Sequence, residues 1–146
     1  MVIVVDANIL IQCIINIKGK TAALILNNAS DLNFVVPEFV ISETKSKEHK
    51  IYSSSKKKQP LFEENLNLLL STVVTINDDD ISENIFKRAY EIVRDIDPCD
   101  VVPVALAIAL EALLWTDDFK LQRGLRRKGF RGVITTKEFK ENLKGL

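Results

Sequence analysis

Four acidic side chains are spaced so that they could share one chemical site. Asp6 directly follows a short apolar run at the start of the chain, and Asp118 follows another apolar run much later. Glu43 and Asp100 lie near the beginnings of two expected helices. In open parallel sheets, functional groups collect at the carboxyl ends of the strands. We therefore expect these four carboxylates to converge on one edge of a sheet.

Converging carboxylates repel one another unless a cation supplies counter-charge. Mg²⁺ and Mn²⁺ prefer such oxygen ligands. A bound ion of this kind lowers the pKa of a water molecule to form a nucleophile, and it stabilises the charge that develops on a phosphate. The four acids therefore predict a metal-dependent site that hydrolyses phosphodiester bonds.

The remaining inventory excludes several other chemistries. His49 is the only histidine, so a histidine-rich zinc site is impossible. Cys13 and Cys99 are far apart and form no CxxC motif, which makes thiol redox chemistry an unsuitable interpretation. No glycine-rich phosphate loop is present. The net charge of zero also argues against a module that binds nucleic acid through charge alone.

Alternating strands and helices must position the acids. The pattern predicts an α/β fold over residues 1–146, a single domain in which a central parallel sheet of four to five strands forms a three-layer α/β/α sandwich. The expected strands are Val2–Val5, Phe34–Val36, Leu113–Thr116 and Val133–Thr135, with the short apolar run Val73–Ile76 as a further candidate.

Three segments contain acids that are expected to lie at the ends or on the faces of helices. The helix expected over Glu38–Lys50 carries Glu38, Glu43 and Glu48, of which only one should face the cleft squarely. Asp100 is expected to cap the buried helix Val101–Leu110. The aspartates at positions 78–80 are expected to cap the following helix rather than to bind a metal.

The sequence offers no support for a membrane location. No apolar run reaches the roughly 20 residues of a membrane span. Asp6 interrupts the apolar run at the N-terminus, so a secretory signal is not expected. We therefore expect a cytoplasmic protein.

Four short motifs together resemble the PIN-domain nucleases, in the right order and over nearly the whole chain. The motifs are Asp6-Ala7-Asn8, Val40-Ile41-Ser42-Glu43, Asp97-Pro98-Cys99-Asp100 running into Val104-Ala105-Leu106-Ala107, and Trp115-Thr116-Asp117-Asp118 followed by Leu121 and Gly124-Leu125. Each motif alone is weak, whereas the ordered set of four is fairly specific.

The resemblance implies a function and a set of site residues. Members of the family bind Mg²⁺ or Mn²⁺ and hydrolyse single-stranded RNA. Many small members are toxins of toxin–antitoxin pairs, often homodimeric and held inactive by a small antitoxin. By likeness, the metal ligands and catalytic residues are Asp6, Glu43, Asp100 and Asp118, with Asp97 as an additional ligand and Asn8 and Thr116 as supporting groups.

One position departs from the family pattern. Asp117 stands where many relatives have glycine before the last acid, which leaves the identity of that ligand open. Asp118 is preferred because of its spacing from Thr116 and Leu121.

A basic stretch follows the last acid and could bind RNA phosphates or simply face solvent. Its members are Arg123, Arg126, Arg127 and Lys128.

Two other functions remain as alternatives. One is a non-catalytic PIN-like module that binds RNA or a protein. The other is a phosphate-transferring hydrolase with Asp6 as nucleophile, although such enzymes need an aspartate where this chain has Asn8.

Overall fold

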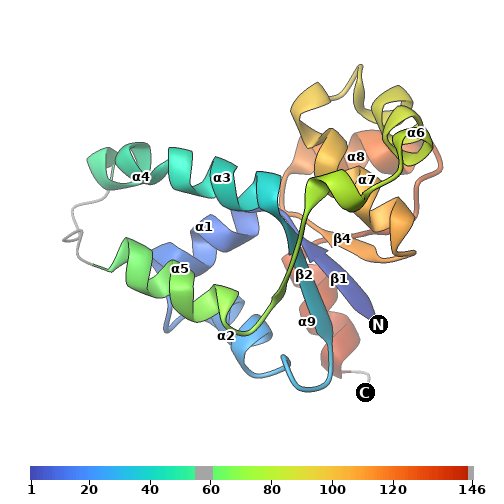
Figure 1. The fold of residues 1–146 in the computed structure, drawn as a ribbon. Coiled ribbons are helices and arrows are strands. Elements are labelled where there is room, and N and C mark those ends of the chain that lie inside the picture. Colours follow the sequence, from blue (N-terminus) through green and yellow to red (C-terminus); the bar gives the residue numbers. More distant parts are fainter. Residues whose placement is uncertain (55–60, 145–146) are drawn as a thin grey trace.

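A five-stranded parallel sheet carries the fold in the computed structural model, which describes residues 1–54 and 61–144 (Figure 1). The strands are β1 (Val2–Val5), β2 (Asn33–Pro37), β3 (Val74–Ile76), β4 (Leu113–Trp115) and β5 (Val133–Ile134). They lie side by side in the order β3-β2-β1-β4-β5, and every pairing is parallel. The prediction of a parallel sheet in an α/β fold is confirmed, and Val74–Ile76 supplies its fifth strand.

The two faces of the sheet belong to two separate apolar clusters. Ile3 and Val5 of β1 point to one cluster together with Trp115, whereas Val4 and Leu114 point to the other. Successive residues of a strand alternate between faces. Because both faces are buried, the strands consist of continuous apolar runs instead of an apolar–polar alternation.

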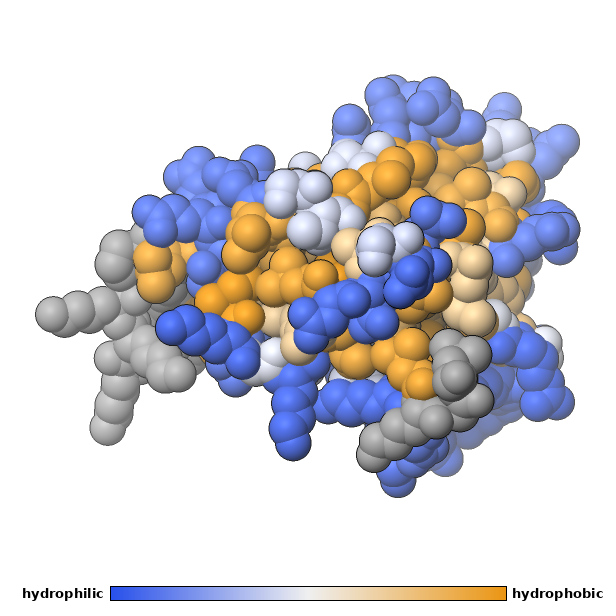
Figure 2. All heavy atoms as spheres, turned by 90° about the horizontal axis from the view of Figure 1, so that it is seen from below, coloured by the Kyte–Doolittle hydropathy of each residue, from blue (hydrophilic) through white to orange (hydrophobic). Residues whose placement is uncertain are grey.

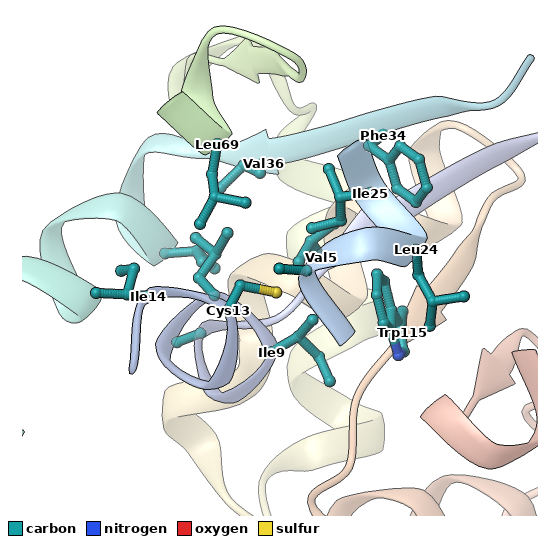
Figure 3. Close-up of a cluster of buried hydrophobic side chains, with 14 of the residues drawn as sticks. Val5, Ile9, Cys13, Ile14, Leu24, Ile25, Phe34, Val36, Leu69 and Trp115 are labelled. Atoms are coloured by element: carbon teal, nitrogen blue, oxygen red, sulfur yellow. The ribbon is translucent and has the colours of Figure 1, made fainter. Parts of the chain in front are cut away.

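Helices cover both faces and complete the three layers. The helices on the Trp115 side are α1 (Ala7–Ile15), α2 (Lys20–Leu26), α3 (Glu38–Ser46), α4 (Glu48–Ser54), α5 (Phe62–Leu70) and α9 (Thr136–Lys144). The helices on the Leu114 side are α6 (Glu83–Val93), α7 (Val101–Ala109) and α8 (Phe119–Arg127). In the first cluster, Val5, Cys13 and Ile25 bring together a strand and two helices (Figure 3). The predicted α/β/α sandwich is therefore confirmed.

The helix predicted over Glu38–Lys50 is two helices, so this prediction is wrong in its extent. Helix α3 ends at Ser46, and α4 begins at Glu48. The hydroxyl of Thr44 donates to the carbonyl of Val40 at 2.8 Å, and that of Ser46 donates to the carbonyl of Glu43 at 2.7 Å. Hydroxyl groups that bond to helix carbonyls compete with the backbone, which favours a helix end here.

The aspartates at positions 78–80 do not cap α6, contrary to expectation. Ser82 has that role, because its hydroxyl accepts the N–H of Ile85 at 3.3 Å. Asp78 instead accepts the N–H of Phe39 at 3.0 Å, at the start of α3. The reason is that β2 and β3 are neighbours, so the residues that follow them meet at the same edge.

The amino ends of the strands form a largely apolar edge. Figure 2 shows hydrophobic side chains gathered among hydrophilic ones on the face seen from below. Met1, Leu32, Leu113 and Leu143 help to line a hollow of about 270 Å³ there. The acids Asp6 and Asp118, which follow β1 and β4, lie instead at the opposite, carboxyl edge.

No single helix of the described residues is long and apolar enough to cross a bilayer. Helices α1 and α2, which meet at a bend of 110°, would have the length and composition only together.

Gly124 in α8 allows a close contact with Ile96 in the segment that follows α6. A Cβ atom at this position would lie 2.5 Å from Cδ1 and 2.8 Å from Cγ1 of Ile96. We expect Gly124→Ala to destabilise the protein by about 1–2 kcal/mol, because overpacking outweighs the roughly 1 kcal/mol that alanine gains as a helix former. Urea unfolding measures the difference. Lys120→Ala, an exposed change on the same helix, should stay within about 0.5 kcal/mol of wild type. A Gly124→Ala protein as stable as wild type would contradict the expected clash.

Candidate active site

Asp6 lies where two central strands end side by side. Val5 pairs with Trp115 across β1 and β4, so the next residues, Asp6 and Thr116, are neighbours. The Asp6 carboxylate is only 5% exposed and caps α1, with Oδ1 accepting the N–H of Ala7 at 2.8 Å. Its other oxygen, Oδ2, accepts the Thr116 hydroxyl at 2.8 Å and the Asn8 amide at 3.3 Å. Hydrogen bonds therefore fix both oxygens of this acid.

The Thr116 hydroxyl connects three parts of the site. Besides donating to Asp6, its oxygen accepts the Asn8 amide at 3.1 Å and the N–H of Asp118 at 3.1 Å. Thr116 is fully buried. Both residues predicted to support the site, Asn8 and Thr116, thus contact its acids directly.

The two consecutive aspartates after β4 have different tasks. Asp118 caps α8, because its Oδ1 accepts the N–H of Leu121 at 3.1 Å. Asp117 accepts the N–H of Thr136 at 2.7 Å and its hydroxyl at 2.6 Å, and it also accepts the Gln12 amide at 3.1 Å. Asp117 therefore holds the start of α9 against α1.

Asp100 stands at the head of α7, but its side chain makes no capping hydrogen bond. The prediction that the Asp100 side chain caps α7 with a hydrogen bond is therefore wrong. Asp97 caps the preceding 3₁₀ turn instead, with its Oδ1 accepting the N–H of Cys99 at 3.0 Å. Pro98 begins this turn, so hydrogen-bonded turns start before α7 itself. Oδ2 of Asp100 is buried without a partner.

Of the three acids predicted on one helix, only Glu43 is partly buried. Its side chain is 27% exposed and pairs with Lys47 one turn later, with Nζ and Oε1 3.4 Å apart. Glu38 and Glu48 are exposed, and Glu48 belongs to the next helix. This placement favours Glu43, among these three acids, as the one that lies with Asp6, Asp100 and Asp118.

The acids act on one another electrostatically, which shows that they share one region. Burial and then the charges of Asp6, Asp97, Asp118 and Glu43 raise the pKa of Asp100 to about 8. Burial also raises the pKa of Asp6, against the hydrogen bonds from Thr116 and Ala7, and the charges of Glu43 and Asp118 add to this increase.

By their chemistry, these residues fit a hard divalent cation. All donors are carboxylate oxygens, one of them is buried without a partner, and extra positive charge would relieve their mutual repulsion. As the side chains stand, no three acidic, histidine or cysteine residues in the described part of the chain are arranged to hold a metal ion. A bound cation would therefore require the carboxylates to reorient.

The raised pKa of Asp100 predicts how stability depends on pH. The folded protein keeps this proton up to about pH 8, whereas the unfolded chain loses it near the ordinary value of 3.8. The metal-free protein should therefore lose stability as the pH rises from about 4 to about 8, with a slope approaching 1.4 kcal/mol per pH unit for each such carboxyl group.

Thermal unfolding in EDTA at a series of pH values measures this slope. Asp100→Asn should flatten it, and Asp80→Asn, a change at an exposed acid, should not. An equal slope in wild type and Asp100→Asn would show that Asp100 is not the buried acid responsible.

The different tasks of Asp117 and Asp118 predict different losses. Asp117→Asn should weaken the contacts with Thr136 and lower stability by about 1–2 kcal/mol, because hydrogen bonds to charged groups are stronger than neutral ones. Asp118→Asn keeps the amide oxygen that caps α8, so its effect should fall on divalent-cation binding. Urea unfolding measures the loss of stability, and calorimetric Mn²⁺ titration measures the loss of cation binding. Weaker Mn²⁺ binding by Asp117→Asn, together with lower stability of Asp118→Asn, would make Asp117 the ligand and Asp118 the structural residue.

The basic residues after β4 differ in their freedom to bind a ligand. Arg126 forms two hydrogen bonds with Glu138, at 2.8 and 2.7 Å, and Lys128 pairs with Asp95. Arg123 lies over the Phe119 ring, 5.2 Å from its centroid. Arg127 is exposed.

Sequence reasoning missed two polar residues at the site. Lys47 pairs with Glu43, and its position four residues later on a helix was a usable signal. Gln12 binds Asp117 across 105 residues, which no local pattern could indicate.

Comparisons with known proteins agree with this architecture. The model of the PIN domain family matches residues 4–142, so the chain belongs to the PIN domain family, as its motifs predicted. No curated protein sequence matches the chain.

Three solved structures share the fold at low sequence identity. VapBC2 from Rickettsia felis, bound to a DNA fragment from its promoter, is 19% identical with a TM-score of 0.68, covering 92% of this chain and 97% of its own. PAE2754 from Pyrobaculum aerophilum is 14% identical with a TM-score of 0.69 and 100% coverage of both chains. A toxin–antitoxin complex from Klebsiella pneumoniae is 22% identical with a TM-score of 0.59, covering 90% and 95%.

Proposed function

We propose that this PIN-domain protein is an endoribonuclease that uses Mg²⁺ or Mn²⁺ to hydrolyse single-stranded RNA. One observation carries the proposal: Asp100, whose Oδ2 is buried without a partner, has a pKa raised by burial and then by the charges of four other acids. Burying several acids close together opposes folding, so a cluster of this kind indicates a functional site. Asp6, Glu43, Asp100 and Asp118 are the proposed metal ligands and catalytic residues, with Asp97 as an additional ligand.

The chain's own residues would prepare the site for its ion. Thr116, Asn8 and the N–H of Ala7 hold the Asp6 carboxylate in one orientation. Asp100 has to release its proton before it can act as a ligand, so cation binding is linked to proton release. Glu43 has to exchange Lys47 for the cation. The bound cation would activate water and stabilise charge on the phosphate.

A role as the toxin of a toxin–antitoxin pair belongs to the same proposal. The toxin–antitoxin complex from Klebsiella pneumoniae has a similar fold, which supports a small antitoxin as partner at the level of fold analogy. The proposal also includes a homodimer and a location in the cytoplasm. Co-purification with the product of a neighbouring gene, followed by inhibition of cleavage, would test the antitoxin.

The direct test is cleavage of labelled single-stranded RNA by the purified protein. We expect cleavage with Mn²⁺ or Mg²⁺ and none with EDTA. Cleavage that persists in EDTA would contradict the metal dependence. Calorimetric binding of Mn²⁺ without cleavage of any of several RNAs would contradict the ribonuclease and leave a metal-binding protein of other function.

A non-catalytic module that binds RNA or a protein is the alternative. Among the described residues, the acids as they stand do not have the arrangement of a metal-binding group, which favours it. Absence of Mn²⁺ binding would support this alternative. The use of Asp6 as a nucleophile is disfavoured, because that carboxylate is 5% exposed and both its oxygens accept hydrogen bonds.

A further inference from the structure

A pocket of about 310 Å³ lies between α8 and the segment that follows α6. Its lining includes Asp95, Ile96, Phe119, Lys120, Arg123 and Arg127. Both of its walls lead directly into the acidic cluster, because Ile96 precedes Asp97 and Phe119 follows Asp118 in the chain. A molecule in this pocket would therefore lie next to the candidate active site.

The pocket presents an aromatic ring to solvent. Phe119 is 66% exposed, although it begins a helix whose residues Leu121 and Leu125 are fully buried. The Arg123 guanidinium lies over the ring in cation–π geometry, with its central carbon 5.2 Å from the centroid. An exposed phenylalanine contributes little to folding, whereas aromatic and guanidinium planes are surfaces on which unpaired bases stack.

The charge of the pocket complements a nucleic acid backbone. In the described part of the chain, Lys120, Arg123 and Arg127 form no ion pair. The one acid of the lining, Asp95, is already paired with Lys128. The pocket is thus a local basic surface on a protein whose net charge is zero.

We propose that this pocket holds the nucleotide next to the scissile phosphate, with its base stacked on Phe119 and its phosphate bound by Arg123 and Arg127. The proposal rests on the ribonuclease function above and identifies a contact that the acidic motifs do not supply. Stacking on an aromatic side chain accepts any base, so Phe119 would contribute affinity with little sequence preference. Arg126 is excluded from this role by its pairing with Glu138.

Fluorescence anisotropy with a labelled single-stranded RNA in EDTA tests the pocket without cleavage. We expect Phe119→Ala to weaken binding about 10-fold or more, and Phe119→Trp to retain it. Arg123→Ala should weaken binding and reduce its salt dependence. Tyr90→Ala is the matched control, because Tyr90 is another exposed aromatic residue, on α6, and its loss should leave binding unchanged.

The outcomes separate this inference from the proposed function. Binding that falls in Phe119→Ala and not in Tyr90→Ala supports the pocket, whether or not wild type cleaves RNA with Mn²⁺. Equal binding by Phe119→Ala and wild type overturns it, even if wild type cleaves RNA. Absence of any RNA binding also overturns it, and an acidic protein segment would then be the ligand to test. Where cleavage occurs, Phe119→Ala should raise KM more than it lowers kcat.

Discussion

Replacement of Asp100 by asparagine is expected to reduce metal-dependent RNA cleavage by roughly 1,000-fold. The amide has the size of the carboxyl group but carries no charge, so it is a poorer ligand for a hard cation. The buried Oδ2 of Asp100, which has no hydrogen-bond partner in the protein, is the oxygen we expect the cation to use. Single-turnover cleavage with Mn²⁺ measures the loss.

The same substitution should leave the protein folded. Asp100 makes no capping hydrogen bond, so the amide removes no helix contact. At pH 8 and above, the metal-free variant should be more stable than wild type by at least about 1.4 kcal/mol, the equivalent of one pKa unit, because burial and neighbouring acids oppose the charge. Asp80→Asn controls for the loss of an exposed negative charge. Undiminished cleavage by Asp100→Asn would contradict its assignment as a ligand.

Replacement of Thr116 by valine should cause the largest loss of stability at the site, about 2–3 kcal/mol. The two side chains have similar shape, so packing around this fully buried position is retained. The loss comes from the hydroxyl, which donates to Asp6 and accepts from Asn8 and the N–H of Asp118. Cleavage should also fall by about 10- to 100-fold, because two of the acids lose their orientation.

Thr116→Ser separates the hydroxyl from the methyl group. It keeps the three hydrogen bonds and should retain most of the activity, at a stability loss of about 1 kcal/mol for the missing methyl. Urea unfolding and Mn²⁺-dependent cleavage of the three proteins give the comparison. A Thr116→Val protein with wild-type stability and activity would show that the hydroxyl network is not needed.

The features that the sequence predicted are those set by local apolar patterns. Val2–Val5 and Leu113–Trp115 are recognisable strands because both faces of the sheet are buried, which makes each strand a continuous apolar run. The acids at their ends followed from that placement, since parallel neighbours end at the same edge. Glu43 and Asp100 were predicted from their positions near the beginnings of two expected helices, and the family motifs include the same two acids.

The features that the sequence did not predict depend on partners distant in the chain. Asp117 is adjacent to Asp118, yet it binds Thr136 and Gln12, and only the folded arrangement of α1 and α9 distinguishes the two acids. Likewise, Asp78 binds the first turn of α3 instead of capping α6, because β3 lies beside β2. Capping residues can be recognised by type, but the helix that they cap is decided by tertiary structure.

The order of the strands also controls when the site can form during synthesis. The Asp6 carboxylate receives one of its hydrogen bonds from Thr116, 110 residues later, and Asp117 binds Thr136 at the start of α9. Because β1 pairs with β4, a nascent chain on the ribosome has Asp6 long before the strand and the threonine that orient it. Such distant pairings also form late in folding. If the proposed function holds, the chain would be unable to cut RNA until the residues through Thr136 have been translated.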